Sequence, residues 1–396
     1  MHTAQVETNI RNANLGTAKA HLERLHKLKR DFLPYPRALA MRDGEMEIEI
    51  EGHQSGTPTF WENLGVSAPS ESVIRRLPLT GHALRQLAQR LKIPVRYAVR
   101  MNEGHLNLLD TNVNYWLGEQ PHDKPILVRT YMHENGEGVI RAVLSNRYRV
   151  IDNIGVLTAA VQAMTSLAHE GHSFDVRSVD VQDDKLFLKV NLPDTAKEFP
   201  ELLDGYLPNG GAAASDKITA GFILTNGETG NASLKVVPRL EVEVCTNGMV
   251  VNKAKGQSVD WQLEKRHLGA AQESAIAYSR ESIRKRNEAI SERVKDHIRS
   301  YTDGSFFEQM ITQMRRQRMT EIEGNPVKVL EEVSSELGTT EEERSGIFEA
   351  FFRGTDDSAL GVTHAVTRAA QSFTAERQHE MEGAALPVVD GVFGLN

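Results

Sequence analysis

Apolar residues in the first part of the chain recur with the spacing of helices. In residues 77–109, Leu84 and Leu87 lie three positions apart and share one helical face. Thr80 can cap that helix, and Pro94 suits the first position of the next one. The segment therefore predicts a helical hairpin, which is either a packing unit or a helix-turn-helix that reads DNA.

From residue 125 the spacing changes to the alternation that is typical of β-strands. In the clearest case, Leu240 and Val242 alternate with Arg239 and Glu241, which predicts a half-buried strand. Asn135-Gly136 predicts a tight hairpin turn. Strands are predicted over 44–50, 126–131, 138–144, 174–181, 186–191, 218–224 and 233–244, with one helix that Asp152 or Asn153 caps and that runs through Leu167.

After Gln257 the chain is predicted to be helical almost to its end. A long helix over 263–301 places Ile276, Ile283 and Ile290 at heptad spacing. Shorter helices are predicted over 306–318, 325–337, 340–353 and 359–385, and the tail 386–396 is predicted to be a loose apolar peptide.

Together these patterns predict an α+β fold, in which a mainly antiparallel sheet with packed helices is followed by a helical C-terminal region. The length of 396 residues is enough for two or three domains. We divide the chain into an N-terminal arm and small α/β segment (1–76), an α+β core with the antiparallel sheet (77–260) and a helical C-terminal region (261–396).

The composition is that of an ordinary globular protein, with 40% hydrophobic and 25% charged residues. The single cysteine, Cys245, cannot form an internal disulfide and fits a reducing compartment. No apolar run approaches the ~20 residues that a membrane helix needs. We therefore expect a cytoplasmic protein with no membrane partner. The net charge of −8 lowers the expectation of nucleic-acid binding without excluding it, because the local distribution of Lys and Arg attracts phosphate.

The sequence contains no recognisable catalytic motif. It lacks the glycine-rich Walker loop, the Gly-x-Ser-x-Gly elbow and the His-Glu-x-x-His zinc helix. The pair His169 and His172 has a metal-like spacing, but it follows a predicted helix, where a histidine favours the helix dipole. We predict no bound metal and no cofactor, and we assign no catalytic residue.

Basic and aromatic residues gather around the hairpin 126–144. Arginines neutralise phosphates, and tyrosine rings give bases a platform for stacking, so this pattern predicts a site for single-stranded DNA. The alternative is that these charges form an ordinary solvated face. The residues of this predicted site are Arg129, Tyr131, Arg141, Arg147, Tyr148 and Arg149.

A second basic cluster lies in the long helix, at Arg284, Lys285 and Arg286. We include these residues in the predicted nucleic-acid site. The alternative interpretation is a solvated helix face on which charges pair four positions apart, as Glu281 and Lys285 can.

Two stretches resemble the signatures of a known family. Residues 144–153 (LSNRYRVIDN) resemble its LS-x-R-Y-R-x-x-D-N signature, and residues 221–251, with Thr225-Asn226-Gly227 where Asn-Ser is more usual, resemble its N-S/G-x-x-G … C-x-N-G signature. The family is that of the phage/plasmid-like proteins built on the domain of unknown function 932. The similarity covers residues 77–300 and extends weakly to 361–373. It implies a mobile-element origin and a bacterial cytoplasm, and it implies no activity.

The chemistry of these stretches predicts turns and a possible anion site. Asn-Gly supplies the positive φ angles of tight turns, so Asn226-Gly227 and Asn247-Gly248 are both predicted to be turns. Arg147 and Arg149 precede the helix that begins near Asp152, and a helix N-terminus can hold a phosphate. The alternative is that these arginines pair with Asp152 and cap the junction.

We therefore expect a non-enzymatic DNA-metabolism protein of a phage or plasmid, which binds or anneals single-stranded DNA as a homo-oligomer. One alternative is a metal-dependent nuclease or nucleotide-modifying enzyme, which would need carboxylates that converge on cations. The other is a structural or host-interaction protein that assembles through its C-terminal helices.

Overall fold

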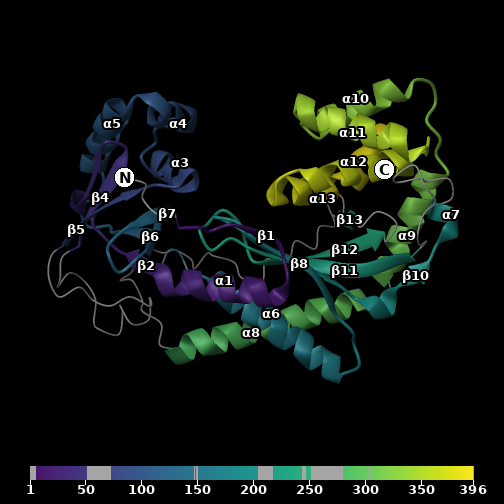
Figure 1. Cartoon of the computed structure of the whole chain (residues 1–396), viewed down its shortest axis with the longest axis horizontal. Coiled ribbons are helices and arrows are strands. Elements are labelled where there is room, and N and C mark those ends of the chain that lie inside the picture. The colour runs from purple at the N-terminus through teal and green to yellow at the C-terminus, as the bar shows by residue number, and fades with distance from the viewer. Residues whose placement is uncertain are drawn as a thin grey trace.

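The computed structural model of the chain describes residues 6–50, 73–146, 148, 150–203, 217–242, 247–250, 280–302 and 305–395. The fold is α+β, as predicted, with antiparallel sheets and a helical C-terminal region. Figure 1 shows two lobes that rise from opposite ends of a central sheet, with long helices beneath it. None of the described helices is long and apolar enough to cross a membrane.

The central sheet joins segments from widely separated parts of the chain. Its strand order is β1-β8-β9-β11-β12-β13, and β10 pairs with β11 at one end. All of these pairings are antiparallel, and the hairpins β8–β9 and β11–β12 are those predicted from the alternation. The strands are β1 (Ile10–Ala13), β8 (Asp175–Val181), β9 (Leu186–Asn191), β10 (Lys197–Glu198), β11 (Lys217–Asn226), β12 (Lys235–Val242) and β13 (Asn247–Val250).

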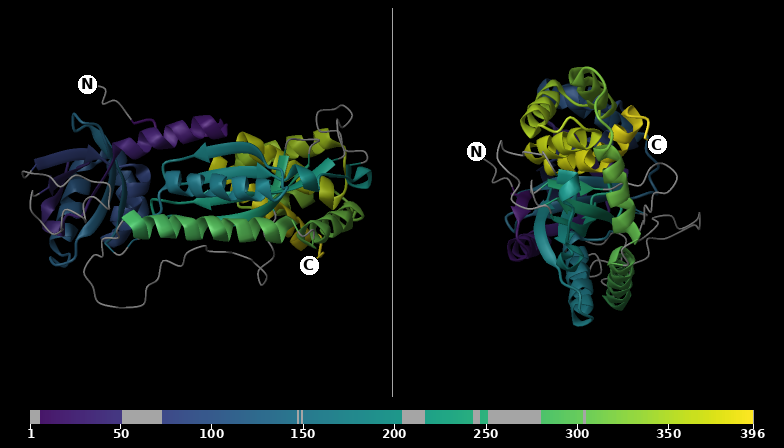
Figure 2. Two further views of the ribbon diagram at one scale, coloured as in Figure 1. Left: turned by 90° about the horizontal axis from the view of Figure 1, so that it is seen from below. Right: turned by 90° about the vertical axis from the view of Figure 1, so that its right-hand side faces the viewer.

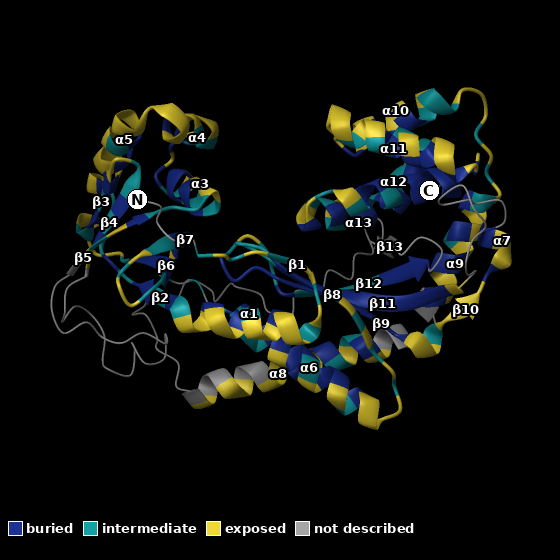
Figure 3. Cartoon of the chain, viewed as in Figure 1, coloured by how far each residue is buried: buried dark blue, intermediate teal, exposed yellow. Residues whose placement is uncertain are grey.

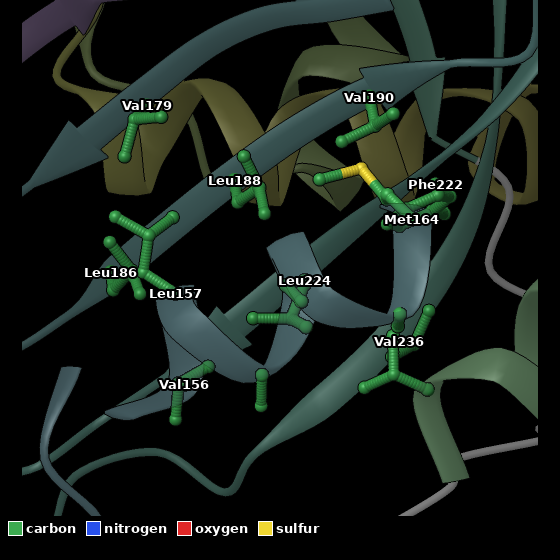
Figure 4. Packing of buried hydrophobic residues seen from close by; sticks show 14 of the residues in the cluster. Val156, Leu157, Met164, Val179, Leu186, Leu188, Val190, Phe222, Leu224 and Val236 are labelled. Atoms are coloured by element: carbon green, nitrogen blue, oxygen red, sulfur yellow. The ribbon is translucent and has the colours of Figure 1, made fainter. Parts of the chain in front are cut away.

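One face of the central sheet is apolar and carries the main core. Leu188, Phe222 and Leu224 point from the strands toward Val156 and Met164 of the helix beneath them (Figure 4). Figure 2 shows the helices of this layer on the opposite side of the sheet from the C-terminal lobe. The layer consists of α1 (Leu15–Leu28), α6 (Asn153–His169) and α8 (Arg280–Thr302), and residues 263–279 of the predicted long helix lie outside the described residues.

The N-terminal lobe contains two small antiparallel sheets and a group of helices. The predicted strand 44–50 is the middle strand of its sheet, and Met46 and Ile48 are fully buried. Strand pairing joins the segment 1–76 to the predicted core, since β2 pairs with β6 and β1 with β8. The elements are β2 (Lys29–Phe32), β6 (Ile126–Met132) and β7 (Gly138–Ser145), then β3 (Leu39–Arg42), β4 (Glu45–Ile50) and β5 (Val73–Pro78), and the helices α3 (Gly81–Arg90), α4 (Val95–Gly104) and α5 (Leu106–Gly118).

The C-terminal lobe is helical and begins where the short helix α7 (Pro200–Leu203) contacts α9. The prediction of a loose apolar tail is wrong for most of residues 386–396. The last helix runs to Val392, and Leu386 and Val389 are buried, because they pack into apolar clusters that the sequence pattern alone does not show. The helices are α9 (Ser305–Arg318), α10 (Pro326–Glu336), α11 (Glu341–Gly354), α12 (Ala359–Ala369) and α13 (Ala375–Val392).

The Asn-Gly pairs differ in their structural roles. Asn135-Gly136 forms the predicted hairpin turn, with a φ of 88° at Gly136. The prediction for Asn226-Gly227 is right about a turn and wrong about its geometry. Asn226 ends β11 and Gly227 begins the turn, but the positive φ, 94°, belongs to Gly230. The prediction of a turn at Asn247-Gly248 is wrong. Asn247-Gly248 begins β13, where Gly248 pairs with Glu241 of β12.

Candidate nucleic-acid interface

The two signature segments meet at the junction between the central sheet and the N-terminal lobe. The side-chain nitrogen of Asn226 donates hydrogen bonds to Asn153 Oδ1 at 2.7 Å and to the carbonyl of Ile151 at 2.9 Å. The backbone N–H of Asn153, at the start of α6, donates to Glu228 Oε2 at 2.8 Å. Residues 75 positions apart in the sequence are therefore joined directly.

Arg129 on β6 lies at the centre of this junction and is fully buried. Its Nε donates to Asp31 Oδ2 at 3.0 Å, and its Nη2 donates to Asp152 Oδ1 at 2.8 Å. Lys29 on β2 donates from Nζ to the other carboxylate oxygen of Asp152 at 2.8 Å. The guanidinium thus connects β2, β6 and the start of α6.

Arg141 on β7 completes the buried arrangement. Its Nη1 donates to the Tyr131 hydroxyl at 2.8 Å and to the carboxylate of Glu228, and its guanidinium lies 4.0 Å from the centre of the Tyr131 ring. The Tyr131 hydroxyl in turn donates to Glu228 Oε1 at 3.1 Å. We call the whole set the junction network, which consists of Lys29, Asp31, Arg129, Tyr131, Arg141, Asp152 and Glu228.

The expected exposed Arg/Tyr surface is therefore not present on this hairpin. Arg129, Tyr131 and Arg141 are 0%, 5% and 2% exposed, so a strand at the surface cannot reach them in this conformation. An arginine does pair with Asp152, but it is Arg129, whereas the sequence had suggested this pairing for Arg147 and Arg149. The exposure of these side chains was predicted wrongly, because the carboxylates that bind the two arginines in the interior come from distant segments of the chain.

The remaining residues of the predicted hairpin site are placed only in part. Tyr148 is half-buried and donates from its hydroxyl to the carbonyl of Gly227 at 3.0 Å, which again links the two signature segments. Arg147 and Arg149 lie outside the described residues. Their predicted contact with phosphate stays a prediction.

The predicted cluster on the long helix lies on α8 and is solvated. Arg284 is exposed and pairs with Glu281 and Glu288, and Lys285 pairs with Glu281 at 3.8 Å. These pairs are the alternative that the sequence left open. The side chain of Arg286 lies outside the described residues.

The electrostatics of the junction network favour ionised carboxylates. Burial alone would raise the pKa of the Asp152 carboxyl, but the charges of Lys29 and Arg129 outweigh it and hold that pKa well below its ordinary value. For Glu228, burial likewise opposes ionisation, and Arg141 and Arg129 outweigh it, so its pKa is also lowered.

Asp152→Asn is expected to make stability less sensitive to acid. Because the folded pKa is depressed, the stabilisation by this carboxylate is fully present above its unfolded value of about 4 and is lost as pH falls toward the folded value. Urea unfolding from about pH 7 to about pH 3 should show a shallower decline below about pH 4 in the variant.

The matched control for this experiment is Asp175→Asn, since the Asp175 side chain is 50% exposed and pairs with Arg177 at 3.2 Å. Its acid profile should follow that of the wild type. If the stability of Asp152→Asn declined below about pH 4 as steeply as that of the wild type, this would contradict the lowered pKa of Asp152.

A different surface, at the top of the N-terminal lobe, exposes arginine and aromatic side chains together. Tyr97 on α4 is 43% exposed, and Tyr115 and Trp116 on α5 are 63% and 43% exposed. Arg96 and Arg100 on α4 are exposed and make no ion pair with another described residue. Figure 3 shows α4 and α5 as a largely exposed band. We call these five residues the α4–α5 surface.

Local sequence explains why these side chains point outward. Ala98 and Met101 are each 1% exposed and fix the inner face of α4. Arg96 and Arg100 are four positions apart, which is about one helical turn, so they share the outer face. The aromatic pair on α5 is ordered by an edge-to-face contact between Tyr115 and Trp116, with 5.2 Å between ring centres.

The turn before α4 adds further positive charge. Lys92 is exposed, and its φ of 59° reverses the chain between α3 and α4, which confirms the predicted helical hairpin. Arg85 on α3 is also exposed and makes no ion pair with a described residue. Glu103, at the far end of α4, is the helix's single carboxylate. Sequence reasoning did not single out this surface, although the excess of Arg and Lys over Glu in 81–104 was a readable signal.

Among the residues that the structure describes, no group of three or more His, Cys, Asp or Glu side chains could hold a metal ion.

No curated protein and no solved structure matches this chain. The family described as Domain of unknown function (DUF932) matches residues 141–381, from β7 into α13. The match contains the Asn153 and Glu228 part of the junction and leaves out the α4–α5 surface. Because it spans more than half of the 396 residues, the chain belongs to the DUF932 family.

Proposed function

We propose that this protein binds single-stranded DNA without cleaving it, and that the α4–α5 surface is where the strand lies. The observation that supports the proposal is the exposure of Tyr97, Tyr115 and Trp116 on helices that also expose Arg96 and Arg100, two cations without an ion pair to any described residue. The sequence predicted binding by arginine and tyrosine side chains on the β6–β7 hairpin. The same residue types are buried there and exposed on α4 and α5.

Each part of the surface has a role in such binding. The arginines neutralise phosphates and release counterions, which makes binding depend on salt. Aromatic rings stack on bases of any identity, because every base has a π-face. The overall charge of −8 would repel DNA elsewhere on the molecule, so the local excess of cations on α3 and α4 would orient the strand.

We propose further that the protein acts in strand annealing, as a homo-oligomer in the cytoplasm of a bacterium that carries a phage or plasmid. The absence of a Walker loop from the sequence fits a role that does not consume nucleoside triphosphate through such a site. The resemblance to phage/plasmid-like proteins supports the setting.

The Arg96→Ala/Arg100→Ala variant tests the proposal. If each arginine contacts one phosphate, the slope of log K against log salt should become shallower by about 1.4 for a labelled oligothymidylate, since each contact with a single strand contributes about 0.7. Fluorescence anisotropy over a series of NaCl concentrations measures the slope.

Arg316→Ala/Arg353→Ala is the matched control, because both residues are exposed cations on helices of the other lobe. Its slope should equal that of the wild type. Equal slopes for the two double variants, or no salt-dependent binding by the wild type, would contradict the proposal. Tighter binding of a duplex would mean that α4 works as a groove-reading helix, and this would also overturn it.

A further inference from the structure

The face of the central sheet that looks toward the C-terminal lobe carries charges, yet it is buried. Lys189 on β9, Arg239 and Glu241 on β12 and Asp180 on β8 are all 5% exposed or less. A charged face of an antiparallel sheet ordinarily lies in water, as the alternation of Arg239 and Glu241 with Leu240 and Val242 indicates. Here the lobe that contains α13 covers it (Figures 1 and 2).

Cations are in excess on the covered face near α13. His379 of α13 shows this, because burial and, to a smaller extent, four nearby cations together lower the pKa of its imidazole to about 3. These cations are Lys185, Lys189, Lys235 and Arg239, all of which lie on or next to β9 and β12. Asp180 and Glu241 balance this charge only in part, through ion pairs with Lys189 at 3.6 Å and Arg239 at 2.9 Å.

Helix α13 presents carboxylates to these cations. Glu376 forms an ion pair with Lys185, which links the first turn of α13 to the start of β9. Glu382 is 1% exposed, and burial raises the pKa of its carboxyl, although the nearby charges of Lys189 and Arg239 oppose that rise. Its Oε1 accepts hydrogen bonds from Gln378 at 2.8 Å and Gln371 at 2.9 Å.

Some buried polar atoms between α13 and the sheet make no hydrogen bond with a described residue. Arg239 Nε, Glu382 Oε2 and His379 Nδ1 are buried and have no hydrogen-bond partner among the described residues. Buried polar atoms of this kind destabilise the closed arrangement, because they have lost water without gaining a partner. The opposite face of the sheet, which packs on α6, is apolar instead.

The two ends of α13 differ in how they are held. Toward its C-terminal end, Leu386 belongs to an apolar cluster with Leu240 and Val242 of β12. At its N-terminal end, the apolar contact with the sheet is small, formed by Ala375 with Phe187 and Ile223. The N-terminal end therefore has the smaller apolar attachment to the sheet.

We propose that the charged face of β9 and β12 is a second binding site for a phosphate backbone, and that α13 occupies it with carboxylates in place of phosphates. Movement of the N-terminal end of α13 away from the sheet would expose Lys189 and Arg239 together with the half-buried Lys185 and Lys235, in two rows that β11 separates. The identification of the polyanion as single-stranded DNA rests on the proposed function, whereas the site itself does not.

The test compares wild type with Glu376→Lys, which breaks the ion pair with Lys185 at a side chain that is 50% exposed. Lysines are labelled with an amine-reactive acetylating reagent and read by mass spectrometry, with and without oligothymidylate. Lys189 reports on the covered face, because its side chain is 7% exposed in the closed form. Lys92, exposed beside α4, reports separately on the α4–α5 surface.

We expect Glu376→Lys to raise the labelling of Lys189 several-fold and oligothymidylate to reverse this rise. Glu380→Lys is the control, since it makes the same change of charge on α13 at a side chain that is 64% exposed and pairs with Arg377. Adding Lys185→Glu to Glu376→Lys should restore the ion pair with reversed charges and return Lys189 to its protected state.

Equal protection of Lys189 in Glu376→Lys and wild type would overturn the proposal, as would labelling that oligothymidylate does not reduce. Protection of Lys92 without protection of Lys189 would leave the proposed function intact and remove the second site. Protection of Lys189 without protection of Lys92 would support the second site and contradict binding at the α4–α5 surface.

Discussion

Arg129→Met is expected to lower the free energy of unfolding by ~3–5 kcal/mol, which is typical when one partner is removed from a buried ion pair. The substitution leaves the carboxylate of Asp31, which is 1% exposed, without its cation. It also removes the donor that joins β6 to Asp152 at 2.8 Å. Urea unfolding followed by circular dichroism measures the change.

The matched control is Arg42→Met in the same lobe. Its side chain is 68% exposed and pairs with Glu47, so the loss should be ~0–1 kcal/mol. Similar losses in the two variants would show that the junction network does not stabilise the fold in the way its burial indicates.

Tyr97→Ala/Trp116→Ala is expected to weaken binding of oligothymidylate by a large factor. If each ring stacks on one base, each contributes ~1–3 kcal/mol, so the double variant should lose ~2–6 kcal/mol of binding free energy. That is at least about a thirtyfold rise in Kd. A stacked ring neutralises no phosphate charge, so the slope of log K against log salt should change little in this variant. In Arg96→Ala/Arg100→Ala, by contrast, that slope should become shallower.

Phe352→Ala is the control for the loss of an exposed ring. Phe352 lies on α11 in the other lobe, is 56% exposed and makes an edge-to-face contact with Phe351, much as Trp116 does with Tyr115. It should bind as tightly as the wild type. A Kd for Tyr97→Ala/Trp116→Ala within a factor of two or so of that of Phe352→Ala would refute stacking on this surface.

Much of the secondary structure could be predicted from the sequence, because it depends on local periodicity. The alternation in 126–144 and 174–191 predicted the two hairpins, and the Asn135-Gly136 turn set the end of the first. The tail 386–396 could not be predicted, since its helix is stabilised where Leu386 and Val389 meet apolar clusters from other segments.

The predicted combination of arginine and tyrosine is buried at the predicted positions, and an exposed combination of the same residue types lies elsewhere. Arginine with tyrosine occurs both at Arg141 and Tyr131 and at Arg96 and Tyr97, and the sequence pattern of the first pair looked more like a binding hairpin. Arg141 is buried because the carboxylate of Glu228, 87 positions away in the sequence, accepts a hydrogen bond from it in the interior. Arg96 has no such carboxylate among the described residues and stays in water.

The sequence by itself determined the order of the elements, the α+β class and the family to which the chain belongs, because these depend on spacing and on local motifs. Only the tertiary structure decided which charges are buried. Asp31 and Arg129 meet across 98 positions, and the charged alternation in β12 faces α13 instead of water. Burial of a charge depends on a partner brought by the fold, and no local pattern contains that partner.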